Sequence, residues 1–177
     1  SMEFLCHKWM DKFFGDKADK YRYKHIVDAF SFIPYGTIVD EFQHIVYENP
    51  DLTPAERDAE YLKLEKKYRP YLSFEGIPYL EKGTRWQYQM HIYESPFYYI
   101  DYCLAQCVAL GFLGLSRADF ADALDKYLAF LRATGSVSFG ELVEGAGLKP
   151  PFEAGALKEI AAKQRRGHPR SREKDLK

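Results

Sequence analysis

A histidine and three tyrosines lie close together in the middle of the chain: His91, Tyr98, Tyr99 and Tyr102. A tyrosine hydroxyl in buried surroundings seeks a hydrogen-bond partner, so several of them beside an imidazole suit a polar ligand such as a peptide carbonyl. Preorganised phenol groups of this kind could donate hydrogen bonds to an oxyanion. The alternative interpretation is a core histidine packed among aromatic rings, and the spacing alone does not separate the two.

A second candidate is the segment Asp40–His44, which has the form of the zinc motif H-E-x-x-H with aspartate in place of the first histidine. Zinc needs two ligands one helical turn apart and a third from elsewhere, and a carboxylate-first variant is not a standard protease site. Glu41 and His44 also have the E-x-x-H spacing of di-iron bundles, but that site requires a second such pair, which the sequence lacks. We therefore expect no metal site in this chain.

Other kinds of catalytic site have no signature in the sequence. A serine or cysteine nucleophile needs a base and an orienting group, and no nucleophile elbow is present. The glycines form no phosphate-binding loop. Cys103 and Cys107 lie four apart in an apolar helical run, where thiols act as small buried hydrophobic groups. Because Cys6 makes the number of cysteines odd, we expect no disulfide scaffold.

The elements that must position these residues are helices, because helix start and stop signals are frequent and strand alternation is nearly absent. We expect an all-α, multi-helix domain. Two capping boxes mark helix starts, one at Thr53–Glu56 and one at Ser138–Glu141. Further signals predict a helix that opens at Ser116–Asp119 and ends near Gly135, and a last short helix from Phe152 to about Lys163.

Upstream of the histidine, the sequence predicts a helix with one buried face. Pro34, in the segment Ile33–Gly36, must bend or break any helix that runs from Asp16, because proline removes a backbone donor. Asn49–Pro50 closes the helix that follows, and Leu72–Lys82 is typical of a loop. The apolar stripe of that helix consists of Ile38, Val39, Phe42, Ile45 and Val46.

The tyrosines are expected in the first turns of a buried helix. Ser95 is a candidate N-cap and Pro96 a candidate first helical residue, and the apolar run from Phe97 continues to Leu115. His91 would then lie just before this helix, which we expect to be buried on nearly all sides.

The charge is unevenly distributed. The 177-residue chain has a net charge of −1, but residues 163–177 carry +5 and residues 1–162 carry −6. We interpret residues 163–177 as a basic flexible tail rather than a nucleic-acid or membrane-surface arm. The longest apolar stretch is too short to span a membrane, and the N-terminus lacks a signal-peptide pattern. We expect a cytoplasmic protein with no nucleic-acid or membrane partner.

Several segments resemble the C-terminal part of the M3-family oligoendopeptidases, the oligoendopeptidase F group of zinc metallopeptidases. They span residues 1 to about 162, which we take as one helical domain: Phe32–Gly36, Val39–His44, Val46–Pro50, Arg85–Tyr102, Ser138–Phe139, Leu142–Val143 and Ala146–Leu148. The resemblance implies an all-helical peptidase whose zinc is held by an H-E-x-x-H helix and a more distal glutamate. None of these ligands maps onto this chain, since Asp40–His44 matches a helix downstream of the zinc motif and Glu3 does not match the third ligand.

By similarity, the residues that hold the peptide carbonyl during hydrolysis map onto His91, Tyr98 or Tyr99, and Tyr102. The expected function is that of a C-terminal fragment of a zinc-dependent oligoendopeptidase acting on short peptides, with no zinc bound to this chain alone and no activity in isolation. Its partners would be peptide substrates and the N-terminal portion of the peptidase, or a second copy that packs on exposed apolar surface. The alternative function is a non-catalytic helical module that binds peptides or proteins.

Overall fold

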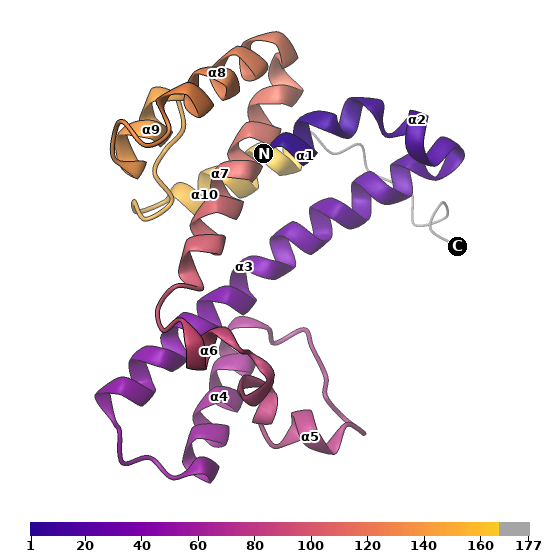
Figure 1. Cartoon of the computed structure of the whole chain (residues 1–177). Coiled ribbons are helices and arrows are strands. Elements are labelled where there is room, and N and C mark those ends of the chain that lie inside the picture. The colour runs from indigo at the N-terminus through magenta and orange to yellow at the C-terminus, as the bar shows by residue number, and fades with distance from the viewer. Residues whose placement is uncertain (167–177) are drawn as a thin grey trace. The chain divides into compact units, whose positions relative to one another are not determined.

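A computed structural model of the chain describes residues 1–166, which are helical and contain no strand (Figure 1). The all-α expectation is therefore confirmed for this part of the chain. In chain order the α-helices are α1 (Met2–Leu5), α2 (Asp11–Phe14), α3 (Ala18–Glu48), α4 (Pro54–Tyr68), α5 (Pro78–Glu81), α6 (His91–Glu94), α7 (Ile100–Ala118), α8 (Phe120–Ala133), α9 (Phe139–Gly145) and α10 (Ala156–Arg166), and the 3-10 helices are η1 (Cys6–Trp9), η2 (Gly15–Lys17) and η3 (Thr84–Tyr88).

The described residues form two compact units. One unit comprises residues 30–103, and the other combines residues 1–29 with the part that begins at residue 104. Helices α3 and α7 each contribute residues to both units. Helix α10 continues to Arg166, so the first residues of the segment expected as a basic tail are helical, and residues 167–177 lie outside the described part.

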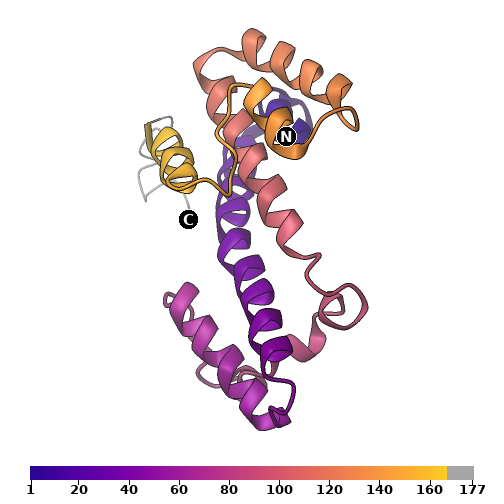
Figure 2. The ribbon, with the colours of Figure 1, turned by 90° about the vertical axis from the view of Figure 1, so that its left-hand side faces the viewer.

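The unit of residues 30–103 has its core where the C-terminal half of α3 packs on α4 and η3 (Figure 2). The predicted apolar stripe is confirmed, because Ile38, Val39 and Phe42 are fully buried and Ile45 and Val46 pack against them. Thr53 caps α4 with the predicted capping box. Tyr61 and Leu64 of α4 and Trp86 of η3 complete this core.

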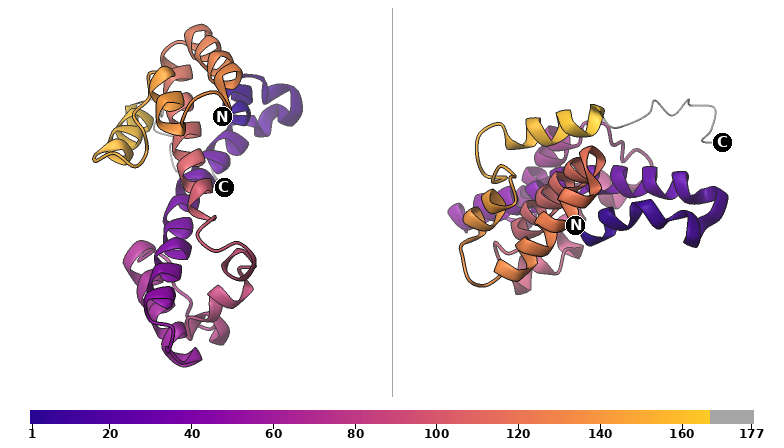
Figure 3. Two further views of the ribbon diagram at one scale, coloured as in Figure 1. Left: turned by 60° about the vertical axis from the view of Figure 1, so that its left-hand side comes forward. Right: turned by 90° about the horizontal axis from the view of Figure 1, so that it is seen from above.

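The other unit has its core around the C-terminal half of α7, where α8, α9 and α10 gather (Figure 3). Ser138 caps α9 with the second predicted capping box. Gln164 of α10 donates to the carbonyl of Leu110 over 2.7 Å and accepts from Arg117 over 2.6 Å, which ties α10 to α7. The apolar core consists of Val108, Phe112, Val143, Ala146 and Leu148.

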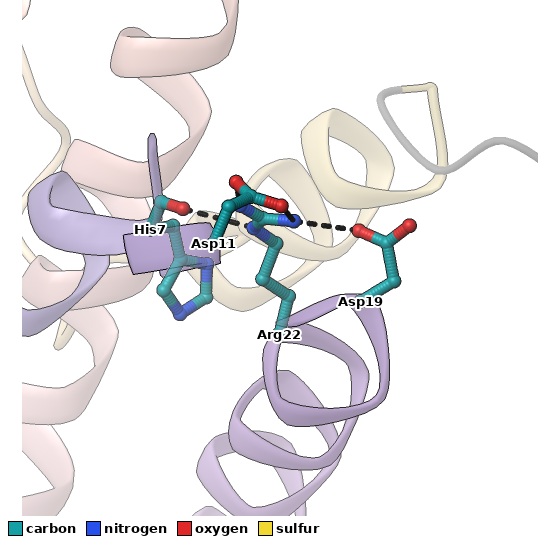
Figure 4. Close-up of polar contacts among 4 residues, drawn as sticks. All are labelled: His7, Asp11, Asp19 and Arg22. Atoms are coloured by element: carbon teal, nitrogen blue, oxygen red, sulfur yellow. Dashed lines mark hydrogen bonds and ion pairs between the residues drawn. The ribbon is translucent and has the colours of Figure 1, made fainter. Parts of the chain in front are cut away.

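The N-terminal turns of the same unit are held by Arg22 of α3 (Figure 4). Its guanidinium donates to the carbonyl of His7 over 2.8 Å, to Asp19 over 2.7 Å and to Asp11. The imidazole rings of His7 and His25 are hydrogen-bonded, with 2.8 Å between His7 Nε2 and His25 Nδ1. These contacts fix η1 and α2 against the first turns of α3.

Of the bend or break expected at Pro34, a break does not occur, since α3 runs without interruption from Ala18 to Glu48. One interior proline costs about 3 kcal/mol, whereas each large apolar side chain buried one to two turns later contributes about 1.5–3 kcal/mol. Ile38 and Phe42 alone can therefore offset the lost bond. In the turn after the proline, the Thr37 hydroxyl donates to the carbonyl of Ile33 over 2.9 Å.

The helix predicted to open at Ser116–Asp119 and to end near Gly135 is confirmed as α8, whereas the helix start predicted at Pro96 is wrong. Ser116 lies inside α7, where its hydroxyl donates to the Leu113 carbonyl, and Asp119 is the N-cap of α8 because its carboxylate accepts from the backbone of Ala121 and Asp122. Helix α7 begins at Ile100 and not at Pro96, because Phe97 has a left-handed backbone with φ 62° that no helix start tolerates. Smaller differences are that α10 starts at Ala156 and that the Leu72–Lys82 loop contains α5.

Candidate functional site

The structure brings together the four residues whose types first suggested chemistry. His91 is the first residue of α6, Tyr98 and Tyr99 lie in the turn between α6 and α7, and Tyr102 is in the first turn of α7. The His91 ring lies 5.0 Å from that of Tyr99, 5.8 Å from that of Tyr102 and 6.5 Å from that of Tyr98, measured between centroids. All four belong to the unit of residues 30–103. Their role in binding stays a prediction.

The turn that carries the tyrosines is shaped by Phe97, the only non-glycine residue with positive φ in the described chain. Its backbone N–H donates to the side-chain oxygen of Gln43 over 3.3 Å. Its ring packs against His44 at 4.8 Å and Tyr47 at 5.0 Å. A left-handed bulky residue is strained, and such strain persists only where the surroundings impose it. Contacts from α3 thus fix the turn that precedes Tyr98 and Tyr99.

The three tyrosines differ in accessibility. Tyr99 is 9% exposed, whereas Tyr98 is 47% and Tyr102 40% exposed. Burial raises the pKa of Tyr99 to about 12, and a hydrogen bond with Tyr98 raises the pKa of Tyr102 above its usual value. Tyr99 and Tyr102 therefore keep their protons at neutral pH and can donate hydrogen bonds. The arrangement offers accessible phenol donors beside an imidazole.

Two further residues belong to the cluster and were missed by the sequence interpretation. The Tyr35 hydroxyl donates to Gln89 Oε1 over 2.7 Å, and Gln89 Nε2 lies 2.8 Å from His91 Nδ1. The Tyr35 ring also meets Tyr99 edge-on at 6.0 Å. Gln89 lies two residues before His91 in the segment Arg85–Tyr102, so its proximity to His91 could have been predicted from the sequence. Tyr35 is 54 residues away from Gln89, and no spacing rule connects them.

The charged residues of the zinc-like segment of α3 pair with each other and with α4. Asp40 and His44 are 3.6 Å apart as an i,i+4 pair, and burial raises the pKa of the Asp40 carboxyl. Glu41 is occupied by Lys67, at 2.7 Å, and by the Tyr68 hydroxyl. Within residues 1–166, no three His, Cys, Asp or Glu side chains are placed to hold one ion. These residues therefore do not fit a three-ligand zinc site.

Two of the three cysteines are buried among apolar side chains. Cys103 and Cys107 are buried, as expected, and burial raises the pKa of Cys107 to about 11, so its thiol is a poor nucleophile at neutral pH.

No helix in the described part of the chain combines the length and apolarity needed to cross a membrane.

Comparison with known proteins places this arrangement in a family. The sequence model of peptidase family M3 matches residues 4–162. The chain belongs to peptidase family M3. This match confirms the resemblance seen in the sequence, and it covers both units of the fold.

Three solved structures are similar to this chain. A protein described as an oligoendopeptidase F is 50% identical, with a TM-score of 0.88 over 93% of this chain and 29% of that one. PZ peptidase A, solved with an inhibitor, is 48% identical, with a TM-score of 0.85 over 91% and 29%. A protein of Bacillus anthracis that is also described as an oligoendopeptidase F is 41% identical, with a TM-score of 0.75 over 93% of this chain and 26% of that one. The chain thus spans less than a third of each relative. No curated protein gave a match.

Proposed function

We propose that this M3 chain is the substrate-side, C-terminal portion of a zinc-dependent oligoendopeptidase that hydrolyses short peptides in the cytoplasm. His91, Tyr98, Tyr99 and Tyr102 would hold the peptide carbonyl and the oxyanion that develops from it. The observation that carries the proposal is the convergence of these four rings, with Tyr98 and Tyr102 accessible to a ligand.

The chemistry assigned to this chain is binding and stabilisation. A neutral phenol that donates to a developing oxyanion is worth about 3 to 4 kcal/mol at a water-excluded site. Zinc, where bound in an M3 peptidase, supplies an activated water. Because the described residues do not fit its ligand set, the zinc ligands would come from the remainder of the enzyme. The isolated chain would then be inactive.

Exposed apolar side chains support a packing partner. Phe13 is 73% and Met90 63% exposed, and the relatives are more than three times longer than the stretch matched here. The partner would be the N-terminal portion of an M3 peptidase, and a second copy of the chain is the other candidate for covering these side chains. A non-catalytic helical module that binds peptides remains the rival function, favoured because no three-ligand group is found within residues 1–166.

Complementation tests the proposal. The chain is co-expressed with the H-E-x-x-H-bearing portion of an M3 relative, and cleavage of a short fluorogenic peptide is followed. Restored cleavage is expected, and His91→Ala or Tyr102→Phe should lower kcat by about 100-fold, the lower end of what an oxyanion donor supplies. Tyr88→Phe is the matched control because Tyr88 is 70% exposed and contacts only the ring of Tyr79 among the aromatic residues described.

Three results would count against the proposal. No cleavage in a complex that forms stoichiometrically would favour the non-catalytic module. Wild-type turnover in both site variants would remove the assigned residues from the site. An equal loss in Tyr88→Phe would show a general effect on folding.

A further inference from the structure

The side chain of Gln89 connects Tyr35 to His91. Its carbonyl oxygen accepts from the Tyr35 hydroxyl over 2.7 Å, and its amide nitrogen lies 2.8 Å from His91 Nδ1. An amide nitrogen can only donate, so in this orientation His91 Nδ1 must be the acceptor. The proton of a neutral imidazole then resides on the other ring nitrogen, Nε2.

The surroundings of Tyr35 favour this orientation of the amide. The guanidinium groups of Arg69 and Arg85 lie 5.1 Å and 4.9 Å from the centre of the Tyr35 ring. Two cations beside a phenol ring make its hydroxyl a better donor and a poorer acceptor. Tyr35 therefore donates, which directs the oxygen of Gln89 toward it and leaves the amide nitrogen for His91.

Arg69, one of the two cations beside the Tyr35 ring, is itself fixed in place. Arg69 is held by Glu65 through a buried ion pair, with 2.8 Å between Arg69 Nε and Glu65 Oε2. A buried charge that loses its partner is strongly unfavourable, so Arg69 has one stable position. The series Glu65, Arg69, Tyr35, Gln89 and His91 thus leads from the core of residues 30–103 to the candidate site.

We infer that Gln89 is a positioning residue: oriented by Tyr35, it holds His91 as the neutral tautomer with its proton on Nε2, so that the imidazole offers a donor. The role of that donor rests on the proposed function, in which it would bind the peptide carbonyl. With the opposite tautomer, Nε2 would be a bare acceptor and would repel a carbonyl oxygen.

The first test reads the tautomer directly and needs no activity. The 177-residue chain is labelled with ¹⁵N-histidine, and long-range ¹H–¹⁵N spectra are recorded at pH 8, with His91→Gln used to assign the His91 signals. The expected result is a pyridine-like Nδ1 and a pyrrole-like Nε2 at full population. A protonated Nδ1, or a mixture of both tautomers, would overturn the inference from the wild-type spectrum alone.

Variants test the cause of the tautomer. Gln89→Glu places a group that can only accept beside Nδ1, so the two nitrogen signals of His91 should exchange character. Gln87→Glu is the matched control, since it adds the same charge two residues earlier on a side chain that bonds Asp58 and not His91. Tyr35→Phe should give a mixture of tautomers, and an unchanged single tautomer would show that Tyr35 does not orient Gln89.

Kinetics of the complemented enzyme give an independent reading. Gln89→Glu should lower kcat by about 10-fold at neutral pH, the lower end of what loss of an orienting partner costs at other histidine sites. An unchanged kcat in Gln89→Glu would contradict the positioning role. If the wild-type complex is inactive, the proposed function fails while the tautomer is still decided by the spectra.

Discussion

A Cβ atom on Gly36 would lie 2.2 Å from the sulfur of Cys103, so α3 and the beginning of α7 meet there without room for a methyl group. The same Cβ would lie 3.6 Å from the ring of Tyr99. This close approach sets the distance between the helix that carries Tyr35 and the turn that carries the tyrosines.

Gly36→Ala is expected to destabilise the chain by about 1–3 kcal/mol, the usual effect of overpacking, although alanine is intrinsically the better helix former by about 1 kcal/mol. Urea unfolding monitored by circular dichroism measures the change. The double variant Gly36→Ala/Cys103→Ala should recover stability relative to the sum of the single changes. Gly145→Ala is the control, because open space surrounds that helical glycine; equal effects at both positions would contradict the steric argument.

Phe97 gives a comparison of two small side chains. Phe97→Ala and Phe97→Gly both lose the ring contacts with His44 and Tyr47, but only alanine keeps a Cβ at φ 62°. We expect the glycine variant to be the more stable by about 1 kcal/mol, because the left-handed region costs other residues about 1–2 kcal/mol. Thermal unfolding of the two variants in parallel decides the order. An alanine variant of equal or higher stability would mean that this turn is not strained.

The sequence predicted those parts of the fold that depend on local chemistry. The capping boxes at Thr53 and Ser138 need only four consecutive residues, and the stripe from Ile38 to Val46 needs only the helical period. Pro34 misled the prediction because its local cost is smaller than the tertiary packing one to two turns later. Pro96 misled it because nothing local indicates that Phe97 adopts a left-handed backbone.

The candidate site was predictable in its residue types but not in its connections. A histidine followed by tyrosines is visible in the sequence, and the resemblance to M3 peptidases added a role for them. The contact between Tyr35 and Gln89 joins residues 54 apart, and only the packing of α3 brings them together. Gln43, which bonds the Phe97 backbone, is likewise a polar residue on the buried side of α3 that the apolar pattern does not reveal.

The buried side chain of His7 makes stability depend on pH. Burial, with His25, Arg22 and Arg117 nearby, lowers the pKa of His7 to about 4 from 6.5 in the unfolded chain. Tyr21 packs on the two rings, and Glu3 approaches the far nitrogen of His25 at 3.3 Å. Between these pH values the unfolded state binds more protons, so the contribution of His7 to the free energy of unfolding should be constant above pH 7 and fall between pH 6.5 and 4.

The size of this loss is about 3 kcal/mol at most, since one pKa unit corresponds to about 1.4 kcal/mol. Urea unfolding at a series of pH values measures it. His7→Gln should flatten the curve in this window and leave the losses below pH 4, which come from carboxylates such as Glu41 whose pKa is lowered in the folded chain. A variant with the wild-type slope would show that another group titrates.

Tyr99 should be distinguishable by its titration. Burial raises its pKa to about 12, so its phenol is expected to stay protonated when the pH passes 10, the ordinary value for tyrosine. Spectra of the chain labelled with ¹³Cζ-tyrosine, assigned with Tyr99→Phe, follow the ionisation of this ring. The urea-unfolded chain serves as control, where the same signal should titrate near 10. Ionisation of Tyr99 near 10 in the folded chain would mean that water reaches the hydroxyl.

The Tyr99 ring is in contact with four other rings, those of Phe32, Tyr35, His91 and Tyr102. To rotate by half a turn about its Cβ–Cγ bond, a tyrosine ring needs free volume on both of its faces. In a close-packed interior, that rotation requires the neighbours to move apart together. The flip rate of the Tyr99 ring therefore reports how often these four neighbouring rings move apart. That one rate measures the rigidity of the whole aromatic cluster around His91.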